Sequence, residues 1–381
     1  MSDIANQQLI LETVERVCAS EFGKYQTDQH YNTVPRALFD SLAAIGLAGL
    51  SVPEQYGGME ASASTTASVF ESISRFDVSP AIFVSVHAMV CGLISRFGDS
   101  AQKQGILPDL ASGKTLGAFA LTEPQAGSDA QAIKTEATIS DGGFTLKGNK
   151  CYITSAGFAD LYLVFARTSD STGSGVSAFL VPASTKGLSI GKPEKKMGAE
   201  LSPIASLFFE DAFVPQSSLL GPLHHGFKVA LSGLAGGRVN IAACANGIAR
   251  SALDISIAHL AERSQFGKQL REFQGLQFMI ADMYQKLEAA RLLTIKAASD
   301  IDAQKKGDLS VNIKLSSSTA KCFATDAAMS ITTDAVQLLG GAGYMREYSV
   351  ERLMRDAKML QIVEGANQVQ RVIIAREILN A

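Results

Sequence analysis

One carboxylate near the C-terminus of this 381-residue chain has the setting of a catalytic base. Glu364 follows the apolar residues Ile362 and Val363 and precedes Gly365, at a turn before a segment of helical pattern. Desolvation by apolar neighbours raises the pKa of a carboxyl group toward the pH at which a base works. A glutamate at a helix start more often does no more than favour the helix dipole. Glu364 is therefore a candidate base that needs support from other segments.

Two segments in the middle of the chain could bind a flat, polar ligand. The loop Leu121 to Asp129 combines hydroxyls and acids with Pro and Gly, so it offers backbone N–H groups and short hydroxyls; an ordinary turn is the alternative. Tyr152 and Thr154 are two residues apart in a β-prone run and so point to the same side of a strand. The ring could stack on a heterocycle while the hydroxyl donates to it, or Tyr152 could be a half-buried sheet residue.

Two helix ends add further polar and small residues. Arg263 to Gly267 contains a cation, an amide and an aromatic ring, and Gln337 to Gly343 ends in glycines that allow close approach to the backbone. Alone, an arginine at a helix C-terminus usually does no more than interact favourably with the helix dipole, and a glycine there usually caps the helix. Because they occur together with the polar loop and Glu364, they favour a site assembled from several parts of the chain.

The composition excludes several classes of function. A net charge of −3 and the lack of any block of like charges argue against a nucleic-acid partner. Neither the cysteines nor the histidines show metal-ligand spacing, and no hydrolase elbow is present. The first residues carry no signal-peptide pattern, and apolar runs such as residues 81–90 fall short of the roughly 20 residues of a membrane span. We expect a cytoplasmic protein with no metal and no membrane contact.

The hydrophobic periodicity divides the chain into three domains and predicts an α+β fold that is mostly α. Residues 1–116 show helical spacing and predict a helical N-terminal domain. Residues 117–225 contain short β-prone runs between turn residues, typical of a β-barrel or sandwich. Residues 226–381 predict a four-helix bundle, with helices at Arg238 to Arg263, Phe273 to Lys305, Asp308 to Leu339 and after Glu364.

Taken in order, these segments resemble the acyl-CoA dehydrogenase family. The match runs through nearly the whole chain, from the loop Val52 to Gly58, through the polar loop and the Tyr152 segment, to Glu364 to Arg371. The resemblance implies a homotetramer or homodimer with one FAD per subunit. It also implies α,β-dehydrogenation of an acyl thioester, acyl-CoA to trans-2-enoyl-CoA, with an electron-transferring flavoprotein as acceptor.

The resemblance also assigns roles to single residues. It implies that Glu364 removes the α-proton while the β-hydrogen leaves as hydride to flavin N5. Some branches carry the base just before the arginine that corresponds to Arg238, where this chain has Gly237. On the substrate side the corresponding residues are Ser128, Arg238, Val363 and Gly365. The positions that correspond to FAD-binding residues are Leu121, Thr122, Gly127, Ser128, Tyr152, Thr154 and Gln368, with Arg263, Phe266, Gln337 and Gly341 reaching the FAD of a neighbouring subunit.

Two departures from the family pattern concern the carrier of the acyl group. Ala235 stands where many members have an aspartate that contacts pantetheine, and Glu200 replaces a common arginine. One alternative is therefore a dehydrogenase or oxidase that acts on an acyl or aminoacyl thioester of a carrier protein. Another is a non-catalytic flavin-fold protein associated with DNA, which the lack of a basic patch disfavours.

Overall fold

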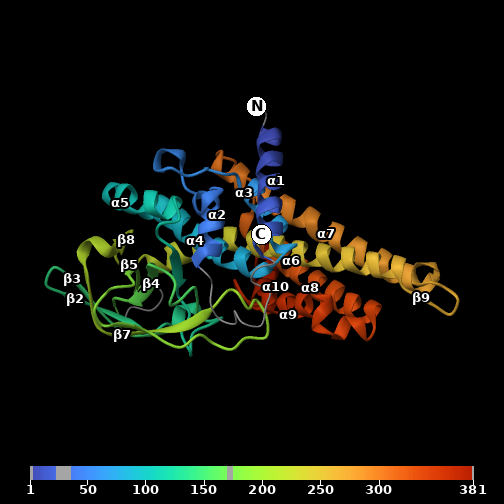
Figure 1. Ribbon diagram of the computed structural model, residues 1–381. Coiled ribbons are helices and arrows are strands. Elements are labelled where there is room, and N and C mark those ends of the chain that lie inside the picture. The colour runs from blue at the N-terminus through green and yellow to red at the C-terminus, as the bar shows by residue number, and fades with distance from the viewer. Residues whose placement is uncertain (1–2, 23–35, 170–174, 380–381) are drawn as a thin grey trace.

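The computed structural model describes residues 3–22, 36–169 and 175–379. In Figure 1 the sheet lies at the lower left, α2, α4 and α5 lie above it, and the long helices α6 and α7 run to the right. Short 3-10 helices connect the main elements, at Leu47–Gly49, Glu54–Tyr56, Ala130–Ala132, Gln216–Ser218, Leu270–Glu272, Ala342–Tyr344 and Arg346–Tyr348.

The N-terminal third is helical, as the sequence predicts. Side-chain caps set the helix starts: Ser62 accepts from the N–H of Thr65, Asp77 accepts from the N–H of Ser79, and Asp99 begins the next helix with a capping box. The helices are α1 (Asp3–Glu21), α2 (Arg36–Ala44), α3 (Ala63–Ser74), α4 (Val78–Phe97) and α5 (Ser100–Ala111).

Helices α4 and α6 (Gly226–Glu262) are both long and apolar enough to cross a membrane by length and composition alone. The expectation that no segment reaches that length is therefore wrong, because Ser85 and His87 barely lower the mean hydropathy of α4, which is 1.8. Most of the apolar 18-residue window of each helix, 83% in α4 and 67% in α6, is buried inside the protein. Packing against other elements accounts for it.

His87 illustrates how tightly α4 is packed. Its Nδ1 accepts from the N–H of Gly117 at 3.0 Å, so Nε2 carries the proton and donates to the carbonyls of Ala48 and Leu110. Burial lowers the pKa of His87 to about 4, which keeps the ring neutral. His87 therefore joins three segments and is not available to a ligand.

The central strands form one connected sheet that folds into two layers. The order is β6-β7-β3-β2-β4-β5-β8, and β1 pairs with β4 off this path. Only one residue pair, Glu136 with Arg167, joins β2 to β4, so the sheet bends there, and it does not close into a barrel within the described residues. The strands are β1 (Gly117–Ala120), β2 (Glu136–Ser140), β3 (Gly143–Thr154), β4 (Leu161–Arg167), β5 (Val176–Pro182), β6 (Leu188–Ile190), β7 (Ile204–Pro215) and β8 (Leu219–Leu220).

Strands β4 and β5 are buried on both faces, which makes the β region a sandwich. Alternate residues such as Leu163 and Leu180 face the core beneath α4 and α5. Their neighbours face β3 and β7, where the rings of Phe144 and Phe179 lie 4.9 Å apart. Such double-sided burial explains why these strands appear in the sequence as continuous apolar runs rather than alternating ones.

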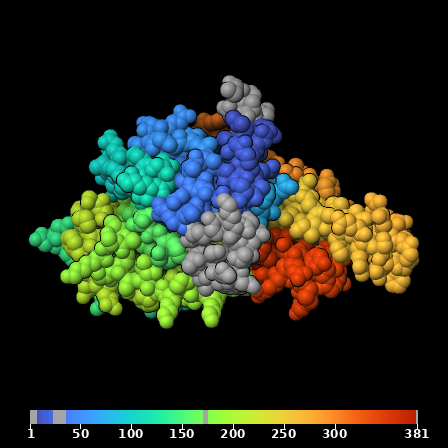
Figure 2. Space-filling view, viewed as in Figure 1, coloured from blue at the N-terminus to red at the C-terminus, as the bar shows by residue number. Residues whose placement is uncertain are grey.

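The C-terminal helices match the predicted bundle with two differences. Helix α6 begins at Gly226, well before the predicted Arg238, because Gly233, Gly236 and Gly237 weaken the helical signal without interrupting the helix. A further helix, α9 (Val350–Leu360), was not predicted. The others are α7 (Gln274–Lys305), α8 (Ile313–Leu339) and α10 (Asn367–Leu379). Figure 2 shows the hairpin between α6 and α7, which contains β9 (Ser264–Gln265) and β10 (Lys268–Gln269), projecting as an arm from the body.

A buried ionic junction joins all three parts of the chain. Arg352 of α9 pairs with Asp77, the cap of α4, at 2.9 Å. Asp356 of α9 accepts from the N–H of Ala199, which follows β6, at 2.6 Å. Beside it, Arg355 pairs with Glu200 at 2.9 Å. Burial raises the pKa of Asp356 to about 7. The junction fixes α9, and with it the turn that follows.

Candidate active site

Glu364 lies in the turn between α9 and α10, where the backbone is strained. Its φ is 54°, in the left-handed region that non-glycine residues rarely adopt, and Gly365 follows with φ 86°. The residue is partly exposed, but its Oε2 is shielded from solvent and has no hydrogen-bond partner among the described residues. Burial raises the pKa of Glu364 to about 7, although the cations Arg238 and Lys321 lower it. These are the properties of a carboxylate that can take up a proton near neutral pH.

The carboxylate of Glu364 lies directly against α6 at Gly237. A Cβ built on Gly237 would be 2.7 Å from Oε2 and 3.0 Å from Cδ of Glu364. Since real Cβ atoms essentially never approach so closely, a larger residue at 237 would displace the carboxylate. The neighbouring Arg238 is buried, donates to Ser318 of α8 at 3.4 Å and has an unpartnered Nε. Helix α6 therefore leaves space for the base and places a cation beside it.

The backbone N–H of Glu364 is also available to a ligand. Within residues 361–367, the N–H groups of Ile362, Val363 and Asn367 donate to backbone carbonyls, whereas that of Glu364 has no acceptor among the described residues. A free N–H beside a base can donate to the carbonyl oxygen of a substrate and stabilise negative charge that develops there.

A buried ion pair supports the polar loop from below. Lys150 of β3 donates to a carboxylate oxygen of Glu123 at 2.6 Å and to the carbonyl of Leu121 at 3.1 Å, and both side chains of the pair are at most 1% exposed. Glu123 also accepts from the N–H groups of Lys134 and Thr135. Burial alone would raise the pKa of Glu123, but Lys150 and these N–H groups hold it below its usual value. The loop is thus rigid on its inner side.

The outer side of the loop is open. Ser128 is exposed, a Cβ on Gly127 would meet nothing within 4 Å, and Thr122 is partly exposed; of the four candidate ligand-binding residues here, Leu121 alone is buried. The N–H of Cys151 donates to the carbonyl of Thr122, so this loop and the Tyr152 segment lie side by side.

Tyr152 points outward because β3 is irregular at this point. The pairing of β3 with β7 shifts register between Lys150 and Ile153, and Tyr152 has φ 57°. As a result Lys150 and Cys151 are both buried, while the ring of Tyr152 is 64% exposed and Thr154 is partly exposed. The alternative of a half-buried sheet residue does not hold for Tyr152.

The remaining candidates lie apart from these residues within one chain. Arg263 and Phe266 belong to the tip of the hairpin, at the opposite end of the molecule from β2 and β3 in Figure 1, and Phe266 is 94% exposed. Gln337, Gly341 and Gln368 are also exposed. One chain therefore brings together Glu364, Gly365 and Arg238, and separately the loop and Tyr152, but not the hairpin residues.

On the proposed substrate side, Val363 is partly buried and packs against the main core beside Glu364. Glu200, which inverts a charge relative to the family pattern, is paired with Arg355, so it does not present an isolated negative charge. Among the described residues no group of three or more metal-ligating side chains is present.

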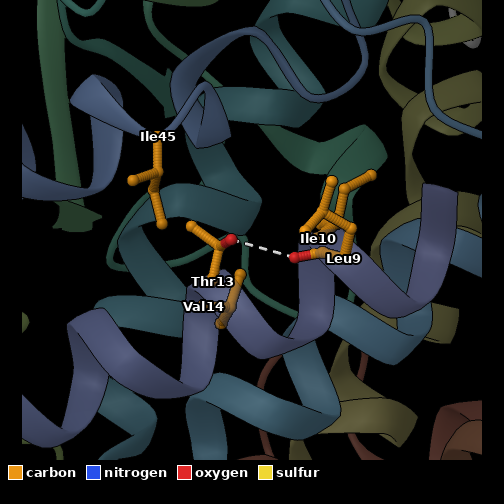
Figure 3. Close-up of a pocket in the computed structure, with 5 residues that line it drawn as sticks. All are labelled: Leu9, Ile10, Thr13, Val14 and Ile45. Atoms are coloured by element: carbon orange, nitrogen blue, oxygen red, sulfur yellow. Dashed lines mark hydrogen bonds between the residues drawn. The ribbon is translucent and has the colours of Figure 1, made fainter.

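An apolar pocket elsewhere lacks the chemistry of an active site. It lies between α1 and Ile45 and is lined by Leu9, Ile10, Thr13, Val14 and Ile45. Figure 3 shows that its one hydroxyl, on Thr13, donates to the carbonyl of Leu9. No titratable group lines it.

Sequence reasoning missed the buried groups that hold these segments: Lys150, Glu123, Lys321, Asn367 and Gln370. A signal was present for Lys321, a lone lysine among Ala320, Ala324 and Ala328 on an apolar stripe of helical spacing. A lysine in such a position is almost never buried unless it is paired.

Comparison with known proteins gives matches along the whole chain. The family models for the N-terminal, middle and C-terminal domains of acyl-CoA dehydrogenases match residues 5–114, 118–212 and 224–379. An acyl-CoA dehydrogenase of Bacillus subtilis (strain 168) is 44% identical over 91% of this chain and 90% of its own length. The structure of butyryl-CoA dehydrogenase from Megasphaera elsdenii superimposes with a TM-score of 0.94 at 39% identity, covering 100% of this chain and 99% of that one. The FAD complex of PigA has a TM-score of 0.92 at 30% identity, covering 99% of this chain and 98% of that one.

Proposed function

The chain belongs to the acyl-CoA dehydrogenase family, and from this premise we propose the roles of its residues in the FAD-dependent conversion of an acyl-CoA to a trans-2-enoyl-CoA. The observation that carries the proposal is the carboxylate of Glu364, which has a shielded, unpartnered oxygen and lies against a glycine. Oε2 of Glu364 accepts the α-proton of the acyl thioester. The raised pKa, about 7, makes the Glu364 carboxylate a stronger base than an ordinary glutamate while a large share of it is still ionised near neutral pH, and a base with a pKa near the working pH is most effective.

Removal of the α-proton requires that the thioester carbonyl be polarised. The free N–H of Glu364 donates to that oxygen, so one residue both orients the substrate and deprotonates it. Arg238 and Lys321 favour the anionic form of Glu364 in the resting enzyme, and Val363 and Gly365 contact the acyl group beside it.

The residues present fit FAD. A flat ring system needs an exposed aromatic face and open hydroxyls and N–H groups, which the ring of Tyr152 and the loop with Thr122, Gly127 and Ser128 offer. We assign Leu121, Thr154 and Gln368 to the same FAD. When bound, FAD supplies the acceptor of the β-hydrogen, which leaves with its electron pair.

We propose that Arg263, Phe266, Gln337 and Gly341 bind the FAD of a neighbouring subunit, so the enzyme is a homotetramer or homodimer. Phe266 at the tip of the hairpin meets the ring of Phe273 edge-on, with 6.3 Å between the ring centroids, yet it is 94% exposed. This exposure supports the proposal, because most of the ring surface is open to a neighbouring subunit. Residues 1–116, 117–225 and 226–381 are the three domains of each subunit.

We further propose a short or medium acyl chain on CoA, an electron-transferring flavoprotein as acceptor, and a cytoplasmic location. The similarity to a butyryl-CoA dehydrogenase supports the chain length. The pairing of Glu200 with Arg355 removes one argument for a carrier-protein thioester, because the inverted charge is compensated. Five buried cysteines without a disulfide fit a reducing compartment.

One titration tests the reaction and its base together. The purified holoenzyme is mixed anaerobically with butyryl-CoA, longer acyl-CoAs and acyl-carrier thioesters, and bleaching of the flavin absorbance is recorded. We expect bleaching with short acyl-CoAs, and none with Glu364→Gln, which is nearly isosteric but cannot accept the proton. Glu364→Gln must still contain FAD and bind the product, as a control for folding. Normal bleaching by this variant would refute the assignment of the base.

A further inference from the structure

The turn that carries Glu364 is held by two fully buried side chains from neighbouring helices. Lys321 of α8 donates to the carbonyl of Gly365 at 3.0 Å and to Oδ1 of Asn367 at 2.8 Å. Gln370 of α10 donates to the carbonyls of Glu364 at 3.1 Å and of Gly365 at 2.9 Å. Two carbonyls in sequence are thus fixed by three donated hydrogen bonds.

This arrangement has a reason in the strain of the turn. A glutamate with φ 54° persists only where its surroundings determine the conformation. If Glu364 relaxed to an ordinary φ, its side chain would leave the space above Gly237, where its carboxylate now lies. Asn367 in turn donates to Asp326 at 2.7 Å, and Asp326 also accepts from Gln361 and Arg371, so the support extends to both ends of the turn.

We propose that Lys321 and Gln370 are positioning residues for the α-proton transfer, in which Gln370 fixes the geometry of the base turn and Lys321 fixes the geometry and also sets the charge environment of Glu364. The inference rests on the role of Glu364 proposed above. Neither residue touches the substrate, and each acts through the carbonyls that flank the base.

The charges around the base come from two helices, α6 and α8. Glu364 faces Arg238 of α6 and Lys321 of α8, both of which lower its pKa against the larger effect of burial. Lys321 itself faces Glu364, Asp326, Cys322 and Arg238, and burial is the main cause that lowers its pKa to about 8. Lys321 is thus mostly charged at neutral pH. When its charge is removed, Arg238 still lowers the pKa of Glu364 but the contribution of Lys321 is lost, so the pKa of Glu364 should rise.

Two isosteric substitutions separate geometry from charge. Lys321→Met removes donors and a charge, Gln370→Met removes donors alone, and Lys314→Met, an exposed lysine of the same helix, is the matched control. The assay is the exchange of the α-protons of 3,3-dimethylbutanoyl-CoA into D₂O, followed by NMR against pD. This thioester has no β-hydrogen, so exchange reports on the base without oxidation of substrate.

For Gln370→Met we expect a plateau of exchange about tenfold below that of Lys314→Met, with the same midpoint, because the carboxylate is misplaced. For Lys321→Met we expect a similar loss and a midpoint about one pH unit higher, because a stabilising cation is gone. If Lys321→Met does not fold, Lys321→Gln, which keeps one donor, must show the raised midpoint.

The outcomes distinguish this inference from the proposed function. Wild-type plateaus in both Met variants, or an unchanged or lower midpoint when the charge of Lys321 is removed, would overturn the positioning roles while leaving Glu364 as the base. Exchange that persists in Glu364→Gln would instead remove the base assignment itself. A plateau loss in Gln370→Met without loss of bound FAD or of thermal stability supports the inference.

Discussion

Replacing Gly237 by alanine should slow the enzyme without destabilising it. The new Cβ would lie 2.7 Å from Oε2 of Glu364, and ordinary contact begins near 3.4 Å, so the carboxylate must retreat by about 0.7 Å (3.4 minus 2.7). A displacement of 1 Å can cost about 100-fold in rate, so we expect kcat to fall roughly 10- to 30-fold. Meanwhile alanine in a helix interior gains about 0.5–1 kcal/mol over glycine, which offsets the local shift.

The chain offers a matched control one residue away. A Cβ on Gly236, also inside α6, meets nothing within 4 Å. Gly236→Ala should therefore raise the thermal midpoint slightly and leave kcat unchanged. The assay is steady-state turnover of butyryl-CoA with an artificial electron acceptor, together with the thermal midpoint and FAD content of both variants. A kcat for Gly237→Ala within twofold of that for Gly236→Ala would refute the placement of Glu364 against Gly237.

Four further predictions concern Lys150, Tyr152 and, in two assays, Glu364. Lys150→Met leaves the buried Glu123 without its cation, at a cost on the order of 3 kcal/mol, so its thermal midpoint should fall well below that of Lys147→Met, an exposed change on the same strand. Equal midpoints would contradict the importance of the pair. Tyr152→Ala should weaken FAD binding about tenfold, measured by fluorescence titration of the apoprotein, without changing apoprotein stability. In the pH profile, kcat/KM should rise with an apparent pKa of about 7, because Glu364 must be ionised. A raised folded-state pKa also means that ionisation of Glu364 destabilises the fold from about pH 4.5 to 7; Glu364→Gln should thus melt higher than wild type above pH 7, and near pH 4 the two should melt alike.

The apolar pattern predicted the element types, because helices that bury one face show helical spacing and strands buried on both faces, such as β4 and β5, appear as continuous apolar runs. The strands β4 and β5 and the helices α7 and α8 have residue patterns that leave little choice of structure. The start of α6 could not be predicted, because Gly233, Gly236 and Gly237 weaken the helical pattern. Two of them, Gly233 and Gly237, allow close contact with Met89 and Glu364, whereas a Cβ on Gly236 would meet nothing within 4 Å. Helix α9 follows helical spacing through Val350, Leu353 and Leu360, but its polar surface conceals it.

The candidate base could be predicted, but its environment could not. Glu364 is visible in sequence because a carboxylate, a glycine and apolar residues are adjacent there. The groups that set its properties, Arg238, Lys321 and Gln370, come from three different helices. Spacing within one segment does not determine which side chains of separate helices meet, so the contacts of these three residues with the Glu364 turn could not be predicted from the sequence.

The ionic junction on α9 also has a consequence for the order of folding during synthesis. Asp77 is made early, but its partner Arg352 follows 275 positions later, and Asp356 meets Ala199 across 157 positions. N-terminal parts of a growing chain fold first. Asp77 at the start of α4 is therefore without its ion-pair partner until Arg352 has been synthesised. The base turn follows the junction in the chain, so segments synthesised after the first two regions complete both the contacts among the three regions and the active site. A chain that ended before the junction would thus lack the base and would also leave Asp77 and the N–H of Ala199 without their partners on α9.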